Sequence, residues 1–178
     1  MPSPSYKIVE YDPDWPPLFE QEKARIVSAL GTGEEGVQHI GSTAVPSLGA
    51  KPVVDMMVGI PSIAQASKYV PPLEAIGYEG RGETVPGALY IRKAGPARFN
   101  LHMTAYGGAF WDDHLLFREY LRAHWDDSVE YEALKGELMS RLAHDPPAYN
   151  DGKSDFIRGI VDRARAGLEE SPGTPLGT

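Results

Sequence analysis

The sequence predicts a single α+β domain with three helices at its C-terminal end. Helix and strand patterns are mixed up to about residue 104, and only helical patterns follow, which is typical of an α+β protein. The 178 residues suit one domain, and the 42% hydrophobic and 24% charged content is that of an ordinary globular chain. We expect one unit over residues 1–168, followed by a disordered tail rich in Ser, Pro and Gly over residues 169–178.

In the N-terminal half, strands and helices are expected to be mixed. Aspartates that can cap a helix, followed by prolines suited to a first turn, mark a helix entry at residues 12–17. The segment 52–60 is apolar apart from Asp55, which indicates a strand buried on both faces. The expected elements are a strand over 6–11, a helix that follows residue 17 and runs to about 30, strands over 37–41 and 52–60, and a helix over 62–76 weakened by two prolines.

In the C-terminal half, a hairpin precedes the helices. Strands over 88–93 and 98–104 flank a turn at 94–97. Three helices are then expected at about 113–125, 128–144 and 153–167, with Pro146-Pro147 separating the last two.

Charge and composition argue against several classes of function. The chain has no cysteine, which excludes a disulfide scaffold, a thiolate zinc site and a cysteine nucleophile. Its net charge of −8 argues against a nucleic-acid partner. There is no long apolar run and no signal-peptide pattern at the start, so we expect no membrane association and a cytoplasmic location.

A polar strand face and one isolated acid are the first candidates for a site. Alternation in the strand 98–104 places Asn100 and His102 on the face opposite its apolar residues. Such a face is also typical of a half-solvated sheet. Asp55, however, lies in an otherwise apolar strand, and a buried carboxylate requires a partner. That partner could be a metal, His102, an arginine or Lys51, and we expect Asn100 and His102 to share one pocket with Asp55 and Ser42.

The Gly41-Ser42-Thr43 turn and several basic residues are candidates for binding an anion. Small residues at a strand end let backbone N–H groups and hydroxyls approach a phosphate, although an ordinary turn has the same composition. No P-loop lysine follows at the required spacing. On the first C-terminal helix, Arg118 and Arg122 are neighbours that suit either phosphate or carboxylates such as Glu119. Lys135 and Lys153, the latter expected in a first helical turn, lie beside apolar stripes and could form structural ion pairs or reach a phosphate.

Several motifs together resemble the GrpB-like family. They run in order from about residue 6 to 165: YDPDW at 11–15, HIGSTAVP at 39–46, KPVVD at 51–55, FREYLRAH at 117–124 and KSDF at 153–156. That family is grouped with the nucleotidyltransferase superfamily, whose best known member is DNA polymerase beta. The resemblance implies a small mixed sheet packed against helices.

In that superfamily a Gly-Ser turn holds nucleotide phosphates and two acids, two residues apart on the next strand, hold magnesium. Gly41 and Ser42 match the turn and Asp55 matches the first acid, but Met57 occupies the second acid position and cannot bind Mg²⁺. The resemblance implies a divalent metal, Mg²⁺ or Mn²⁺, at Asp55, and His102 in place of a third acid suits Zn²⁺ better. The expected catalytic and metal-binding residues are therefore Asp55 and His102. The expected phosphate- and ligand-binding residues are His39, Gly41, Ser42, Thr43, Lys51, Asn100, Arg118, Arg122 and Lys153.

Three functions remain open from the sequence. The first is a nucleotidyltransferase-fold protein that binds a nucleotide or another phosphorylated small molecule and transfers a nucleotidyl group to a small acceptor. The second is a non-catalytic nucleotide-binding accessory module, which the loss of the second acid at Met57 favours. The third is a hydrolase or transferase in which His102 and Asp55 carry out acid–base chemistry without a nucleotide.

Overall fold

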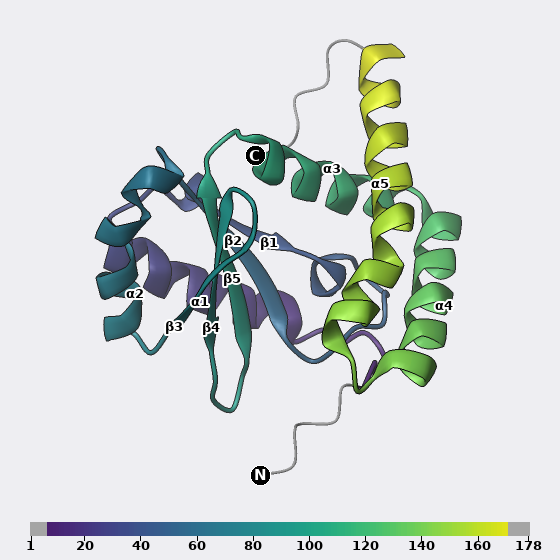
Figure 1. Cartoon of the computed structure of the whole chain (residues 1–178), viewed down its shortest axis with the longest axis horizontal. Helices are drawn as coiled ribbons and strands as arrows, with labels where there is room; N and C mark the ends of the chain where they lie inside the picture. The colour runs from purple at the N-terminus through teal and green to yellow at the C-terminus, as the bar shows by residue number, and fades with distance from the viewer. Residues whose placement is uncertain (1–6, 171–178) are drawn as a thin grey trace.

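A five-stranded mixed sheet in the order β1-β2-β5-β4-β3 lies at the centre of the computed structural model, which describes residues 7–170 (Figure 1). The strands are β1 (Val37–Ile40), β2 (Val54–Ile60), β3 (Glu79–Val85), β4 (Ala88–Lys93) and β5 (Phe99–Ala105). Among these strands, β2 and β5 pair in parallel and the other pairs are antiparallel. The expected α+β class with a mixed sheet is confirmed.

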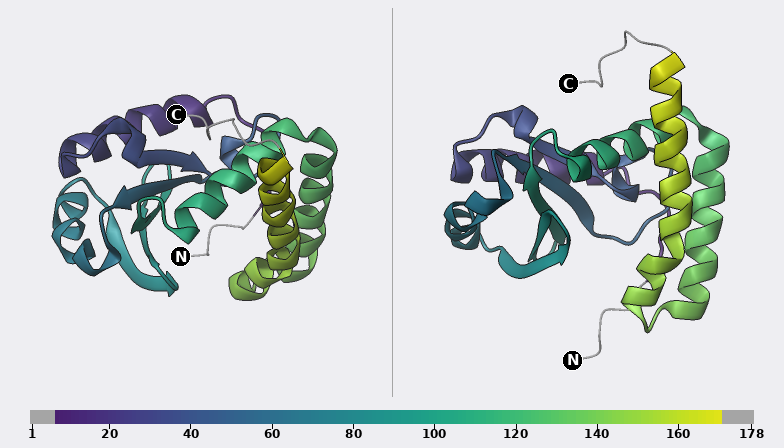
Figure 2. Two further views of the ribbon diagram at one scale, coloured as in Figure 1. Left: turned by 90° about the horizontal axis from the view of Figure 1, so that it is seen from above. Right: turned by 45° about the horizontal axis from the view of Figure 1, so that its top comes forward.

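Helices surround this sheet on both faces. They are α1 (Trp15–Leu30), α2 (Val70–Ala75), α3 (Ala109–Ala123), α4 (Trp125–Leu142) and α5 (Pro146–Glu170), with short 3₁₀ turns η1 (Glu34–Gly36), η2 (Ser42–Ala44) and η3 (Ile63–Lys68). The α4–α5 pair and α2 lie at opposite ends of the molecule (Figures 1 and 2). Of the helices in residues 7–170, none has the length and apolarity to cross a membrane.

Alternation along the strands divides the core into two sides. On one side, Met56 and Leu101 join the main core with α1. On the other side, Met57 packs with Ile40 and with Trp111 of α3. A further cluster buries Leu48, from the loop between β1 and β2, among side chains of α3, α4 and α5. Asp55 and Asn100 have the strand parity of Met57, so they face the C-terminal helices and not α1.

Both ends of α1 follow local rules. Asp12 Oδ1 accepts a hydrogen bond of 2.9 Å from the Asp14 N–H, and the two prolines that follow Trp15 occupy the first turn. The helix ends at Gly31, whose left-handed φ of 64° lets its N–H bind the Val27 carbonyl. The expected strands at 37–41, 52–60, 88–93 and 98–104 are likewise confirmed within one or two residues.

The start of α5 corrects one expectation. Pro146 and Pro147 open this helix and do not precede it, because proline is tolerated in a first turn, and Asp145 Oδ1 accepts from the Ala148 N–H at 3.1 Å. Lys153 therefore lies two turns inside the helix and not in its first turn. The helix runs to Glu170, and residues 171–178, which make up most of the expected tail, lie outside the described part.

Three other expectations differ from the structure. The helix expected at 62–76 is split into η3 and α2, because prolines at 71 and 72 fit only a new first turn. The strand expected at 6–11 is reduced to a single bridge between Val9 and Ala50, and Tyr6 lies outside the described residues. The edge strand β3 was not expected, since its side chains are polar and exposed and its two internal glycines hide any alternation.

Candidate functional site

The Gly41–Ser42 turn lies directly against Asp55. Gly41 follows β1 with a φ of 69°, and Ile40 pairs with Asp55 in the sheet. A Cβ atom added to Gly41 would lie 3.0 Å from Asp55 Oδ2 and 3.1 Å from Asp55 Cβ. Glycine is therefore required here both for its backbone conformation and for the close approach.

A hydrogen-bonded chain of side chains crosses three strands from Asp55. Asn100 Nδ2 donates to Asp55 Oδ1 at 2.8 Å, and the Tyr90 hydroxyl donates to Asn100 Oδ1 at 2.7 Å. Parallel pairing of β2 and β5 sets Asp55 opposite Asn100, so the hydrogen-bond partner of the carboxylate is Asn100, which was not among the partners expected for it. Burial raises the pKa of Asp55, whereas the Asn100 hydrogen bond and three nearby lysines act in the opposite direction.

Those three lysines come from distant parts of the chain. Lys51 precedes β2, Lys135 belongs to α4 and Lys153 to α5, and each has Asp55 as an electrostatic neighbour. Lys135 Nζ donates to Ser42 Oγ at 3.0 Å and to the Gly49 carbonyl. The Lys51 and Lys153 ammonium groups lie 3.9 Å and 4.5 Å from the centre of the Tyr149 ring.

The positive charge of this lysine cluster, defined as Lys51, Lys135 and Lys153, is only partly balanced. Burial first, and then the charge of Lys153, lowers the pKa of Lys51 to about 8. Burial likewise lowers the pKa of Lys135 to about 8, although the carboxylates of Glu132 and then Asp55 oppose this shift. Burial also lowers the pKa of Lys153, and Asp55 opposes that shift. Neither Lys135 nor Lys153 forms a direct ion pair with a carboxylate in the described chain. A cluster with more ammonium groups than carboxylates is complementary to an anion.

Two tyrosines complete the lysine cluster and were missed as site residues. Tyr131 and Tyr149 are buried, and Asp55 contributes to raising the pKa of both phenols after burial itself, that of Tyr149 to about 12. Their spacing carries a usable signal, because Tyr131 precedes Lys135 and Tyr149 precedes Lys153 by four residues. That interval puts each pair on one helix face.

The arginines expected at the site hold the protein's own backbone. Arg118 is buried and donates to the His39 carbonyl at 2.8 Å and to Glu119 Oε1 at 2.7 Å. Arg122 donates to the Ala44 carbonyl at 2.9 Å and also contacts Glu119. Both guanidinium groups therefore hold the β1–η2 segment against α3. Their pairing with Glu119 is the structural alternative to phosphate binding that the sequence left open.

His39 and Thr43 support the turn from the other side of the sheet. His39 stacks on Phe19 of α1 at a ring distance of 4.8 Å, and its Nε2 lies 2.9 Å from Thr43 Oγ1. Both residues are buried. Burial and the nearby Arg122 and Arg118 lower the pKa of His39 to about 3, so the ring is neutral at pH 7. The structure thus brings neither residue together with the lysine cluster.

His102 lies on the expected sheet face, two residues after Asn100 on β5. It is opposite Met57 in the β2–β5 register, and its ring contacts those of Tyr90, Phe110 and His114. Burial and the neighbouring His114 lower its pKa to about 4. Within residues 7–170 no hydrogen bond joins His102 to Asp55. Their joint role in acid–base or metal chemistry stays a prediction.

The donor set around Asp55 does not suit a pair of magnesium ions. Met57 offers no oxygen, and it is fully buried against Ile40 and Trp111. No group of three or more His, Asp or Glu side chains in the described part of the chain is arranged to hold a metal. The ammonium groups of the lysine cluster act on the Asp55 carboxylate and repel a cation there.

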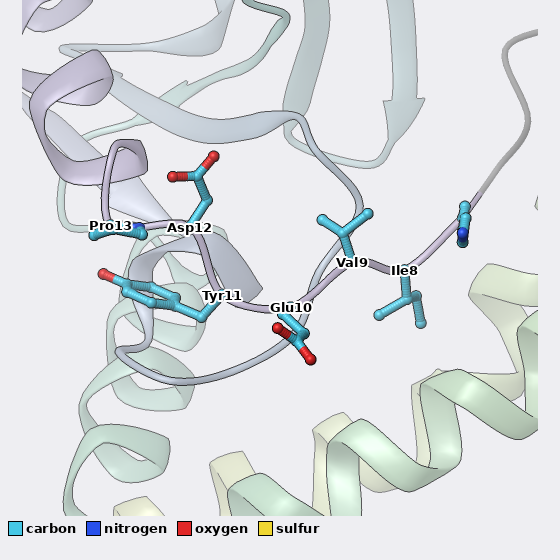
Figure 3. A pocket seen from close by; sticks show the side chains of 7 residues that line it. Ile8, Val9, Glu10, Tyr11, Asp12 and Pro13 are labelled. Atoms are coloured by element: carbon cyan, nitrogen blue, oxygen red, sulfur yellow. The ribbon is translucent and has the colours of Figure 1, made fainter.

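A separate hollow lies in the segment that leads into α1. It is lined by residues 7–13 (Figure 3). Backbone hydrogen bonds of 2.9 Å and 3.0 Å tie Val9 to Ala50. None of the residues lining it belongs to the lysine cluster or to the polar strand face.

The mixed sheet, with its Gly-Ser turn against a strand acid, is similar to the fold of nucleotidyltransferases. A structure of the Cid1 poly(U) polymerase shares this fold, with a TM-score of 0.52 and 15% identity over 82% of this chain and 49% of the polymerase. The chain belongs to the GrpB family, whose model, described as GrpB protein, matches residues 5–163.

Members of this family cover nearly the whole chain. The conserved protein GrpB from Enterococcus faecalis has a crystal structure that covers 91% of this chain and 99% of its own, with a TM-score of 0.78 and 32% identity. The UPF0157 protein YqkA from Bacillus subtilis is 34% identical over 166 residues, which are 92% of this chain. The chain spans 48% of the length of YqkA.

Proposed function

We propose that the lysine cluster and the Gly41–Ser42 turn bind the phosphates of a small molecule, with a nucleotide as the best candidate. One observation carries this proposal: three lysines from separate parts of the chain converge on Asp55, in a protein whose net charge is −8. Ammonium groups suit phosphate as compact point charges. The nucleotidyltransferase fold, shared with Cid1, supports a nucleotide over other phosphate esters.

Binding is better supported than catalysis. The second acid position of the nucleotidyltransferase pattern is Met57. Its side chain carries no oxygen, and it packs against Trp111, which leaves no room for a metal ion there. Three ammonium groups can neutralise phosphate charge where two metal ions otherwise would. We therefore expect binding that does not depend on a divalent cation.

Thermal unfolding with nucleoside triphosphates, pyrophosphate and EDTA or Mg²⁺ tests this proposal. A ligand present at one hundred times its Kd adds about 2.7 kcal/mol to the free energy of unfolding. We expect a rise in Tm with a triphosphate in EDTA, and a smaller rise in Lys153→Met. An unchanged Tm with every phosphate compound, with and without Mg²⁺, contradicts the proposal.

Nucleotidyl transfer is the second candidate, and the position of Asp55 favours it. The carboxylate lies against the phosphate-binding turn, where the first acid of the pattern is found, and Asn100 orients it. In such a transfer an acceptor hydroxyl attacks the α-phosphorus, the bond to the β-phosphate oxygen breaks, and pyrophosphate leaves. Release of pyrophosphate on addition of an acceptor mixture, absent in Asp55→Ala, would favour transfer over binding alone.

A further inference from the structure

Four aromatic rings form a group beside the lysine cluster on the same sheet face. Their centroid distances are 5.4 Å between Tyr90 and His102, 5.5 Å between His102 and Phe110, and 4.0 Å between Phe110 and His114. All four side chains are partly exposed. This ring group is continuous with Asp55, because the Tyr90 hydroxyl donates to Asn100, which in turn donates to Asp55.

The ring group offers hydrogen-bonding atoms as well as apolar surface. His114 Nδ1 lies 2.8 Å from the Phe110 carbonyl and must donate to it, which leaves Nε2 as an acceptor. The His102 ring nitrogens make no hydrogen bond with the described residues. Within residues 7–170, the Tyr78 hydroxyl is the one fully buried side-chain N or O atom that lacks a hydrogen-bond partner. The two His102 nitrogens lack a partner as well, so they are not fully buried. The His102 nitrogens therefore reach solvent and can pair with a ligand.

The two neighbouring regions have opposite character. The lysine cluster is cationic, whereas burial lowers the pKa of both histidines of the ring group, that of His102 to about 4. Asn100 and His102 are two residues apart on β5, which corresponds to about 6.6 Å along the strand. A nucleotide has this same division, with charged phosphates at one end, an uncharged planar base at the other, and a sugar between them.

From this geometry we infer that the ring group of Tyr90, His102, Phe110 and His114 is the subsite for a planar nitrogen heterocycle, the nucleobase of the ligand whose phosphates meet the lysine cluster. The base stacks on the partly exposed Phe110 and His114 rings, and the free ring nitrogens of His102 and His114 pair with its edge. This inference rests on the proposed phosphate site. It adds the nucleobase, the part of the ligand that contacts with phosphate alone do not recognise.

Calorimetric titration in EDTA with inorganic tripolyphosphate and with ATP, GTP, CTP and UTP separates the two proposals. Tripolyphosphate carries the same phosphates without a base. We expect at least one nucleotide to bind the parent protein about tenfold more tightly than tripolyphosphate. If no compound binds, the phosphate site fails and the base subsite with it. If tripolyphosphate binds as tightly as every nucleotide, the phosphate site stands and the base subsite is overturned.

Variants test which residues make a nucleotide bind more tightly than tripolyphosphate. In Phe110→Ala we expect the nucleotide to bind no more tightly than tripolyphosphate, with the tripolyphosphate Kd unchanged. In the control Trp125→Ala, which removes an exposed ring of α4 outside the ring group, we expect the parent's preference. His102→Phe keeps a ring without nitrogens, so affinity should persist while differences among the four bases shrink. A preference that survives in Phe110→Ala, or an equal loss for tripolyphosphate, overturns the inference. If Phe110→Ala does not fold, the test falls to His102→Phe, and unchanged base discrimination overturns the inference.

Discussion

Replacing Asp55 by asparagine distinguishes an anion site from a metal site at the same position. Asparagine keeps the size of the side chain and can still hydrogen-bond to Asn100. It removes a negative charge that acts on all three lysines of the cluster. In an anion site that charge repels the phosphates of the ligand, so its loss strengthens binding. In a metal site it is the ligand of the cation, so its loss weakens binding.

The size of this effect follows from Coulomb's law. Asp55 is an electrostatic neighbour of all three lysines, so its charge acts on a phosphate that their ammonium groups hold. Two unit charges about 5–8 Å apart in an effective dielectric of about 20 interact by about 2–3 kcal/mol. Partial exposure of Asp55 and screening by salt reduce this to about 1 kcal/mol. We therefore expect about fivefold tighter binding of a triphosphate to Asp55→Asn.

Titration of a nucleoside triphosphate in EDTA at low ionic strength measures this change. Asp151→Asn is the matched control, because it removes the same charge from an exposed position of α5. The free protein should become less stable in Asp55→Asn, since each lysine of the cluster loses an attractive neighbour. Weaker triphosphate binding by Asp55→Asn than by the control would refute the anion site, and restoration of affinity by Mg²⁺ in the parent alone would establish a metal site.

Four other outcomes are expected. Lys153→Met should weaken triphosphate binding with little change in Tm, because methionine retains the apolar stem; a lower Tm with unchanged Kd would indicate a structural lysine. Since the lowered pKa of Lys51 and of Lys135 is about 8 and a bound anion raises it, the Kd measured by calorimetry should rise between pH 8 and 10, and a constant Kd would contradict this. Met57→Asp should cost about 3–5 kcal/mol in urea unfolding, because it buries a charge beneath Trp111; a stable variant that binds Mg²⁺ would show that the position is open. Arg118→Met should lower the free energy of unfolding by about 2–4 kcal/mol through its lost bond to the His39 carbonyl while sparing the Kd, and a large rise in Kd would instead place this arginine at the ligand.

Local rules were sufficient for much of the fold and for the strand side of the site. Strand alternation placed Asn100 on a polar face, and the isolated acid in an apolar strand required a partner. The structure supplies that partner as Asn100 Nδ2 at 2.8 Å. Proline rules located the start of α1 but misjudged α5, because a proline pair both ends one helix and opens the next. The edge strand β3 carried no local signal and exists through its pairing with β4.

The sequence by itself determined which side chains share a face of each element, since backbone geometry sets the periods of helices and strands. It thereby made Arg118 and Arg122 neighbours on one helix and placed His102 on the strand face of Asn100. Only the tertiary structure decided which faces meet. Lys135 reaches Ser42 across 93 residues of chain, and Arg118 turns to the backbone of His39 and not toward a ligand. These contacts depend on how apolar surfaces of distant segments are buried together, and a local pattern of residues contains no information about which distant surface will cover it.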